Sequence, residues 1–137
     1  MNIKNITIGF PSRLIGQILV IFALYVQTHG DYSPGGGFQA GALLASNFIL
    51  YSFIYGYEKL ISIISIEALK NISAFGVLLY IGVGIYCLIY SGNFLQYDSI
   101  PLNVLIKQAT GITIIELGVG ITVTASMLLI YLSLKSD

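Results

Sequence analysis

Two polar residues near the end of the first apolar run could exchange protons. His29 is the single histidine in the 137 residues, and Asp31 follows two positions later. An unperturbed histidine changes its charge between about pH 5 and 8, so the pair suits proton handling, or else a hydrogen bond that fixes the local turn. Two such groups are too few for a metal centre, which takes three or four ligands. We therefore expect a proton-handling or structural pair and no metal.

A segment rich in glycine follows this pair and cannot continue a helix, because proline and consecutive glycines break helical patterns. Free backbone amides ahead of a helix could bind an anion. Phe38 and the residues after it stand where a phosphate loop would carry its lysine, so we expect no nucleotide. We interpret the segment as a turn that lets helices pack closely. Its residues are Pro34, Gly35, Gly36, Gly37, Phe38 and Gly41.

Glu116 is a carboxylate inside the last apolar run, within its first few helical turns. A charged side chain inside a membrane costs a few kcal/mol and usually faces a cavity, a partner or a proton path. Three roles remain open: an ion or proton relay, a structural hydrogen bond or ion pair, and a shallow side chain that reaches the interface. Lys107 and His29 are the candidate partners on the same side.

The composition predicts an integral membrane protein. Hydrophobic residues make up 56% of the chain and charged residues 9%, whereas soluble domains carry about a quarter charged residues. The net charge is zero, which gives no case for nucleic acid as a partner. The lone Cys87 excludes an intramolecular disulfide. No serine or cysteine lies in a nucleophilic motif, so we expect neither an enzyme nor a cofactor.

Four apolar segments are long enough to cross a membrane, which takes about 20 helical residues. We predict an all-α integral membrane fold in one domain over 1–137, with spans at about 11–28, 38–57, 72–91 and 108–134. Between the second and third spans, residues 58–70 combine charges with apolar residues, which predicts an amphipathic interfacial helix. Turn residues in 92–101 predict a surface loop.

The basic residues predict the orientation. Five of the six lie before the first span, between the second and third, or after the fourth; these are Lys4, Arg13, Lys59, Lys70 and Lys135. By the positive-inside rule, both termini are then cytoplasmic and the glycine-rich turn faces outward.

Small residues recur at spacings of three and four on three of the four spans. Such faces let membrane helices approach closely. Because four short helices have few internal neighbours, we predict that much of this surface contacts other subunits. The positions include Gly37, Gly41, Ala45, Ser52, Gly76, Gly84, Cys87, Gly120 and Thr124.

The segment from His29-Gly30-Asp31 through Pro34-Gly35-Gly36-Gly37-Phe38 to Gly41 resembles the signature of the MnhB-like or MrpB-like subunit of the multisubunit Na+/H+ antiporter family, of the Mrp or Mnh type. Glu116-Leu117-Gly118-Val119 resembles the acidic element in that family's last helix. The resemblance covers nearly the whole chain, since its length, its spans and the motif positions all agree.

The resemblance implies a small subunit that works only within a hetero-oligomeric cation/H+ antiporter in the bacterial cell membrane. It implies partners among the other subunits and the lipid bilayer, with Na+ and H+ as the ions that the complex moves. The positions that match the family motifs are His29, the turn from Pro34 to Phe38, and Glu116. The relay candidates remain Glu116, His29 and Asp31. Two alternatives stay open: a structural assembly subunit with no ion role, and a membrane subunit of a related hydrogenase or redox-driven complex.

Overall fold

The computed structural model describes residues 3–30, 35–99 and 104–136, although it leaves some side chains near the ends of these ranges undescribed. Within them the chain is helical and contains no strand, as the sequence predicts. The elements are α1 (Ile3–Thr28), α2 (Gly37–Tyr55), α3 (Tyr57–Ile63), α4 (Ile66–Ile89), the short 3-10 helix η1 (Tyr97–Ser99) and α5 (Val104–Ser136).

Four helices are long and apolar enough to cross a membrane, which confirms the predicted fold class. The apolar stretches are Pro11–Thr28 in α1, Gly37–Tyr55 in α2, Ile66–Ile89 in α4 and Ala109–Lys135 in α5. The second stretch ends two residues before the predicted boundary because Gly56 has a φ of +96°, which a helix cannot contain.

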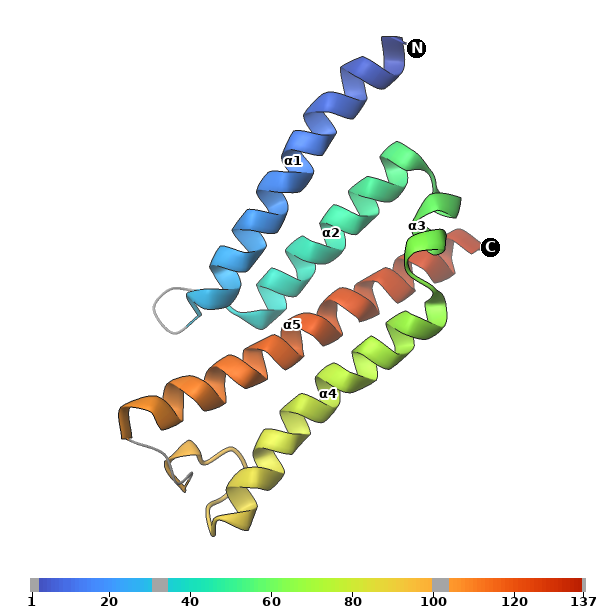
Figure 1. Ribbon diagram of the computed structural model, residues 1–137. Helices are drawn as coiled ribbons and strands as arrows, with labels where there is room; N and C mark the ends of the chain where they lie inside the picture. Colours follow the sequence, from blue (N-terminus) through green and yellow to red (C-terminus); the bar gives the residue numbers. More distant parts are fainter. Residues whose placement is uncertain (1–2, 31–34, 100–103, 137) are drawn as a thin grey trace.

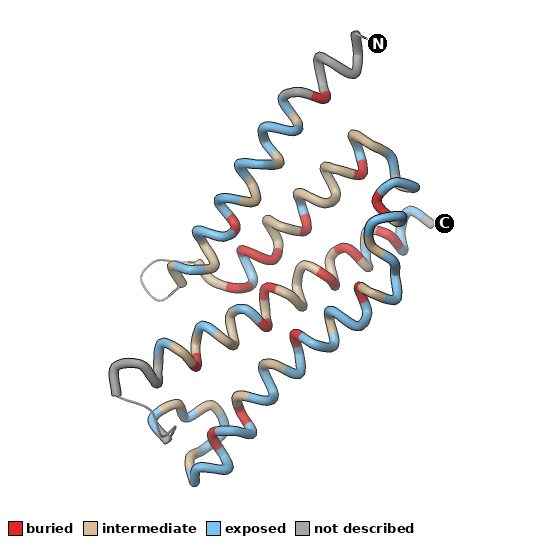
Figure 2. The backbone as a smooth tube through the Cα atoms, viewed as in Figure 1, coloured by how far each residue is buried: buried red, intermediate tan, exposed pale blue. Residues whose placement is uncertain are grey.

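The long helices lie in a row in the order α1, α2, α5, α4 (Figure 1). The last helix of the chain is thus inserted between the second and fourth elements. The start of α1 and the end of α5 lie on the same side of the row, whereas α1 ends and α2 begins on the opposite side (Figure 1). A single row leaves long stripes of each helix exposed (Figure 2). That the termini lie in the cytoplasm stays a prediction.

The segment predicted as one interfacial helix over 58–70 is divided in two. α3 ends at Ile63, and Ser65 then caps α4, since its side chain accepts a hydrogen bond from the amide of Ala68 at 3.1 Å. The second half of the segment is therefore the first turn of a long helix, which begins earlier than the predicted span at 72. Placement of α3 at a membrane surface stays a prediction.

Glycines set the spacing on both sides of α5. A Cβ on Gly41 of α2 would lie 2.7 Å from the carbonyl oxygen of Gly120 on α5. On the other side, a Cβ on Gly118 would lie 2.8 Å from the carbonyl oxygen of Gly76 on α4. Real Cβ atoms do not approach that closely, so only glycine permits these backbones to meet.

The small-residue faces are therefore used within the chain. Our prediction that much of this surface contacts other subunits was wrong, because α5 lies between α2 and α4 and presents one face to each. The small residues that are buried on α2, α4 and α5 are Gly37, Ala40, Gly41, Ala45, Ser52, Gly76, Gly84, Cys87, Gly111, Gly118, Gly120 and Ala125.

Hydroxyl groups add hydrogen bonds across the same interfaces. Thr124 shares its hydroxyl hydrogen between the carbonyl oxygen of Gly120 in its own helix at 2.7 Å and that of Gly41 on α2 at 3.1 Å, and Tyr131 donates to the hydroxyl of Ser52 at 3.0 Å. Such bonds between membrane helices contribute about 0.6 kcal/mol each. They fix the register that the glycine contacts allow.

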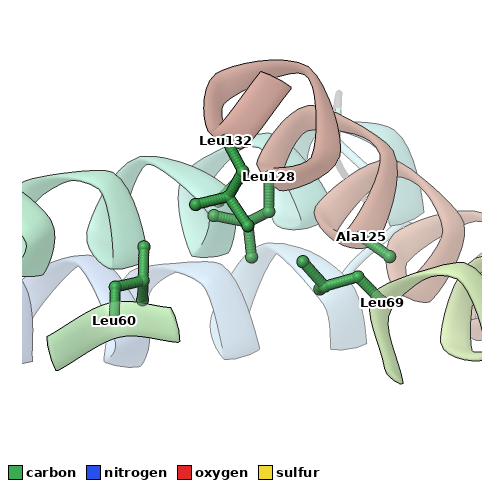
Figure 3. Close-up of a cluster of buried hydrophobic side chains, with 6 residues drawn as sticks. Leu60, Leu69, Ala125, Leu128 and Leu132 are labelled. Carbon is green, nitrogen blue, oxygen red and sulfur yellow. The ribbon is translucent and has the colours of Figure 1, made fainter. Parts of the chain in front are cut away.

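A cluster of buried leucines lies where α3 packs against the last turns of α5 (Figure 3). Leu60 of α3 is 2% exposed, and Leu128 and Leu132 of α5 are equally covered. Ala45, Leu69 and Ala125 complete the cluster. This core lies toward the ends of α2 and α5 that are remote from Gly36 and Gly37. Because it contains side chains of both helices, it fixes α5 relative to α2.

Candidate functional site

The two motifs singled out in the sequence meet in space. Glu116 lies on α5, and its carboxylate is packed against the turn that leads into α2. A Cβ on Gly36 would lie 2.9 Å from Oε1 of Glu116, and a Cβ on Gly30 would overlap both carboxylate oxygens. A Cβ on Gly37 would overlap the backbone carbonyl of Glu116. Three glycines therefore enclose this residue with bare backbone.

The carboxylate also lies at the N-terminus of a helix. α2 begins at Gly37, and its N-cap residue, Gly36, offers no side chain to cap the first amides. The N-terminus of a helix carries a partial positive charge of about half an elementary charge, which favours a nearby anion. The position of Glu116 thus complements the free end of α2.

A small polar cavity of about 210 Å³ lies beside the carboxylate. Thr113 donates its hydroxyl hydrogen to the carbonyl oxygen of Ala109 at 2.7 Å, so only lone pairs of that hydroxyl remain for an occupant. Thr28 likewise donates back to its own helix, with 3.1 Å to the carbonyl oxygen of Leu24. The cavity is lined by Gln27, Thr28, Gly30, Thr113, Glu116 and Leu117. Its oxygen atoms suit a water molecule, a proton or a small cation.

Gln27 belongs to this site, and sequence reasoning missed it. Its Nε2 atom is buried and has no hydrogen-bond partner, the single such side-chain atom in the described part of the chain. Its Oε1 lies against α5, where a Cβ on Gly120 would come within 2.6 Å. The available signal was an amide two residues before His29 in an apolar run, but our reasoning followed charge alone.

His29 lies at the end of α1 but does not line the cavity. Its ring stacks on Tyr25 with the centroids 4.2 Å apart, and Nδ1 lies 3.0 Å from the carbonyl oxygen of Tyr25. Since a carbonyl can only accept, Nδ1 donates this hydrogen bond. The histidine side chain thus folds back on its own helix, where a backbone carbonyl of α1 accepts a hydrogen bond from Nδ1.

The remaining predicted positions have different surroundings in the structure, and some lie outside the described residues. Gly35 lies beside Val26, where a Cβ would approach to 3.1 Å, and Phe38 is 60% exposed. Asp31 and Pro34, as well as the side chain of Lys107, lie outside the described residues. Among the side chains that are described, no three of histidine, cysteine, aspartate or glutamate gather in a way that could hold a metal ion.

Four helices that are long and apolar enough to cross a membrane define a small multi-pass membrane protein, and one of these helices carries a carboxylate that is packed against glycines. Residues 8–129 match the family described as a domain related to the MnhB subunit of the Na+/H+ antiporter. The chain belongs to this family.

Two bacterial relatives match over nearly their whole length. The B-type subunit of the Na+/H+ antiporter of Bacillus subtilis (strain 168) is 28% identical over 130 residues, which cover 88% of this chain and 90% of the relative. A relative from Staphylococcus aureus (strain Newman), named mnhB2, is 27% identical over 138 residues, which cover 98% of this chain and 97% of the relative. Together with the four helices, these relatives identify a multi-pass bacterial membrane protein.

Proposed function

We propose that this chain is the B-type subunit of a hetero-oligomeric Na+/H+ antiporter and that it contributes both to assembly and to the ion or proton pathway. The family match over residues 8–129 supports the first part, as do the names of the relatives. The partners are then the other antiporter subunits, and the role is transport rather than catalysis. A hydrogenase or redox complex is not favoured by these relatives.

The observation that carries the pathway role is the position of Glu116 beside the 210 Å³ cavity. A carboxylate can bind a proton or pair with Na+, and both are substrates of the family's transport reaction. A water molecule needs about 10–15 Å³ of such volume and two to four polar partners. The cavity has room for several waters, so a proton or a partly hydrated cation can reach the carboxylate through it.

A charged Glu116 inside the membrane costs free energy, which argues that its charge has a function. An intramembrane carboxylate costs a few kcal/mol, and an apolar residue would pack against Gly36 and Gly37 at no such cost. The N-terminus of α2 offsets part of the penalty. In the proposed role, ion exchange at Glu116 takes place near the outward-facing turn, with His29 and Asp31 as the flanking relay candidates.

Assembly is the second part of the role. The chain buries its own small-residue faces, so contacts with other subunits fall on the large exposed side chains instead. These are frequent on α1 and α4, for example Ile18 at 56% and Leu78 at 64% exposure. The glycine contacts hold those outer faces in fixed positions.

A tagged copy of this chain, expressed from its own operon, tests the proposal. We expect the larger antiporter subunits to co-purify with it, and vesicles from a strain that lacks the chain to lose Na+-dependent proton exchange until the chain is restored. Co-purification of iron-sulfur or hydrogenase subunits instead would contradict the antiporter assignment. Retention of full exchange in the deletion strain would contradict any need for this subunit.

A further inference from the structure

An open cleft of about 710 Å³ lies between α1 and α2, far from the Glu116 cavity. It is found where the apolar stretch of α1 begins, since Arg13 lies two residues inside the Pro11–Thr28 stretch. Gln17 lines the cleft on the same helix, and Asn47 lines it from α2. The polar part of the cleft is therefore at a membrane boundary.

Two cations lie over the ring of Tyr55, which lines this cleft together with Arg13. The guanidinium carbon of Arg13 lies 5.4 Å from the ring centroid of Tyr55, and the ammonium of Lys59 lies 5.0 Å from the same centroid. In the part of the chain that the structure describes, neither cation forms an ion pair with a carboxylate, and no acidic residue lines the cleft. The rim therefore carries positive charge that an anion would complement.

The deeper walls of the cleft are apolar. Val20 and Ile21 lie on α1, seven and eight residues beyond Arg13, or roughly 10–12 Å along a helix with a rise of 1.5 Å per residue. On α2, Leu50 and Ile54 also line the cleft but lie nearer the rim, because Asn47 lies level with Gly16 and the cations contact Tyr55. The cleft thus runs from a cationic rim to a hydrocarbon-like interior, in the direction that a membrane lipid is oriented.

We propose that this cleft binds an anionic phospholipid. The phosphodiester group lies beside the cations at Tyr55, where Gln17 and Asn47 can donate hydrogen bonds to it, and an acyl chain lies along Val20 and Ile21. Basic pockets between transmembrane helices bind phospholipid head groups for the same reason. A soluble phosphate would match the rim alone, whereas a lipid matches both the rim and the apolar walls. The inference does not depend on antiport activity.

Native mass spectrometry of the membrane complex, isolated through a tag on this chain, tests the proposal. We expect phosphatidylglycerol or cardiolipin to remain bound where phosphatidylcholine does not. Arg13→Gln should weaken this binding about fivefold, and the double variant Arg13→Gln with Lys59→Gln by about 25-fold, since each cation near the surface contributes one such factor. Lys70→Gln, which removes an exposed lysine of α4, should leave the binding unchanged.

Several outcomes would overturn the lipid site. Equal retention of phosphatidylcholine, or unchanged binding in both Arg13→Gln and Lys59→Gln, would remove the role of the cations. Competition by inorganic phosphate or glycerophosphate at concentrations similar to that of the lipid would assign the rim to a soluble anion. Lys59→Gln alters an exposed side chain on α3, so it provides a test even where Arg13→Gln fails to assemble.

Discussion

Oε1 of Glu116 lies where any side chain on Gly36 would begin, 2.9 Å from the position of its Cβ. These residues are far apart in the sequence and belong to the two motifs that the family resemblance singles out. Their proximity gives the glycine-rich turn a physical purpose, since it exposes bare backbone and the start of α2 to a carboxylate inside the membrane. The glycines that precede α2 and the acidic residue of α5 therefore lie against each other.

Gly36→Ala should disturb this site in two ways. Its φ of +149° strains any residue with a side chain, and the new methyl group would also displace the carboxylate. We expect a loss of about 1–3 kcal/mol from the backbone strain, together with a fall in antiport. Thermal unfolding of the purified complex measures the first effect, and vesicle assays measure the second.

Gly56→Ala is the matched control for that variant. Gly56 also has a positive φ, +96°, but a Cβ there meets no atom within 4 Å. It should therefore show the strain without the loss of antiport. Equal antiport in Gly36→Ala and Gly56→Ala would contradict the claim that the contact between Gly36 and Glu116 is needed for antiport.

The contact between α2 and α5 should not tolerate a side chain at Gly41. Gly41→Ala places a methyl group 2.7 Å from the backbone oxygen of Gly120, and overpacking of this kind costs about 1–3 kcal/mol. We expect a lower melting temperature of the complex, and dissociation of this subunit in Gly41→Leu. Gly82→Ala provides the control, because a Cβ on Gly82 meets nothing within 4 Å. If both alanine variants melt like the wild type, the close packing of α2 and α5 is contradicted.

Gln27→Met should separate stability from function. The buried Nε2 atom has no partner in the described part of the chain, and such a group costs about 1–3 kcal/mol. Replacement by an apolar side chain of similar length should therefore leave the melting temperature equal or higher. Antiport should fall several-fold, because the amide is the one hydrogen-bond donor side chain of the cavity that also lies against α5. Unchanged antiport would assign Gln27 to packing alone.

The sequence predicted the helices better than their arrangement. Span lengths follow from hydropathy, and the break at Gly56 shifts a boundary by only two residues. The insertion of α5 between α2 and α4 could not be derived, because small residues on a helix reveal that something packs closely but not which helix does. This is why we assigned those faces to other subunits.

The candidate site at Glu116 was predicted only in part, for a similar reason. Glu116 and the glycines could be selected from residue type alone. A charge in an apolar run raises the free energy of membrane insertion, and a glycine triplet raises the entropy cost of folding. Their contact depends on helix order, which periodicity does not contain. Gln27 is uncharged and conspicuous only once its amide is seen to be buried beside Gly120.

Glu116→Gln tests the central claim most directly, because it removes the charge and keeps the shape of the side chain against Gly36. In vesicles that contain the assembled complex, we predict that Na+-dependent proton exchange falls at least tenfold. Glu67→Gln, which alters an exposed carboxylate in the first turn of α4, should retain wild-type exchange. Wild-type exchange in an assembled Glu116→Gln complex would contradict the relay and leave the chain with a structural role alone.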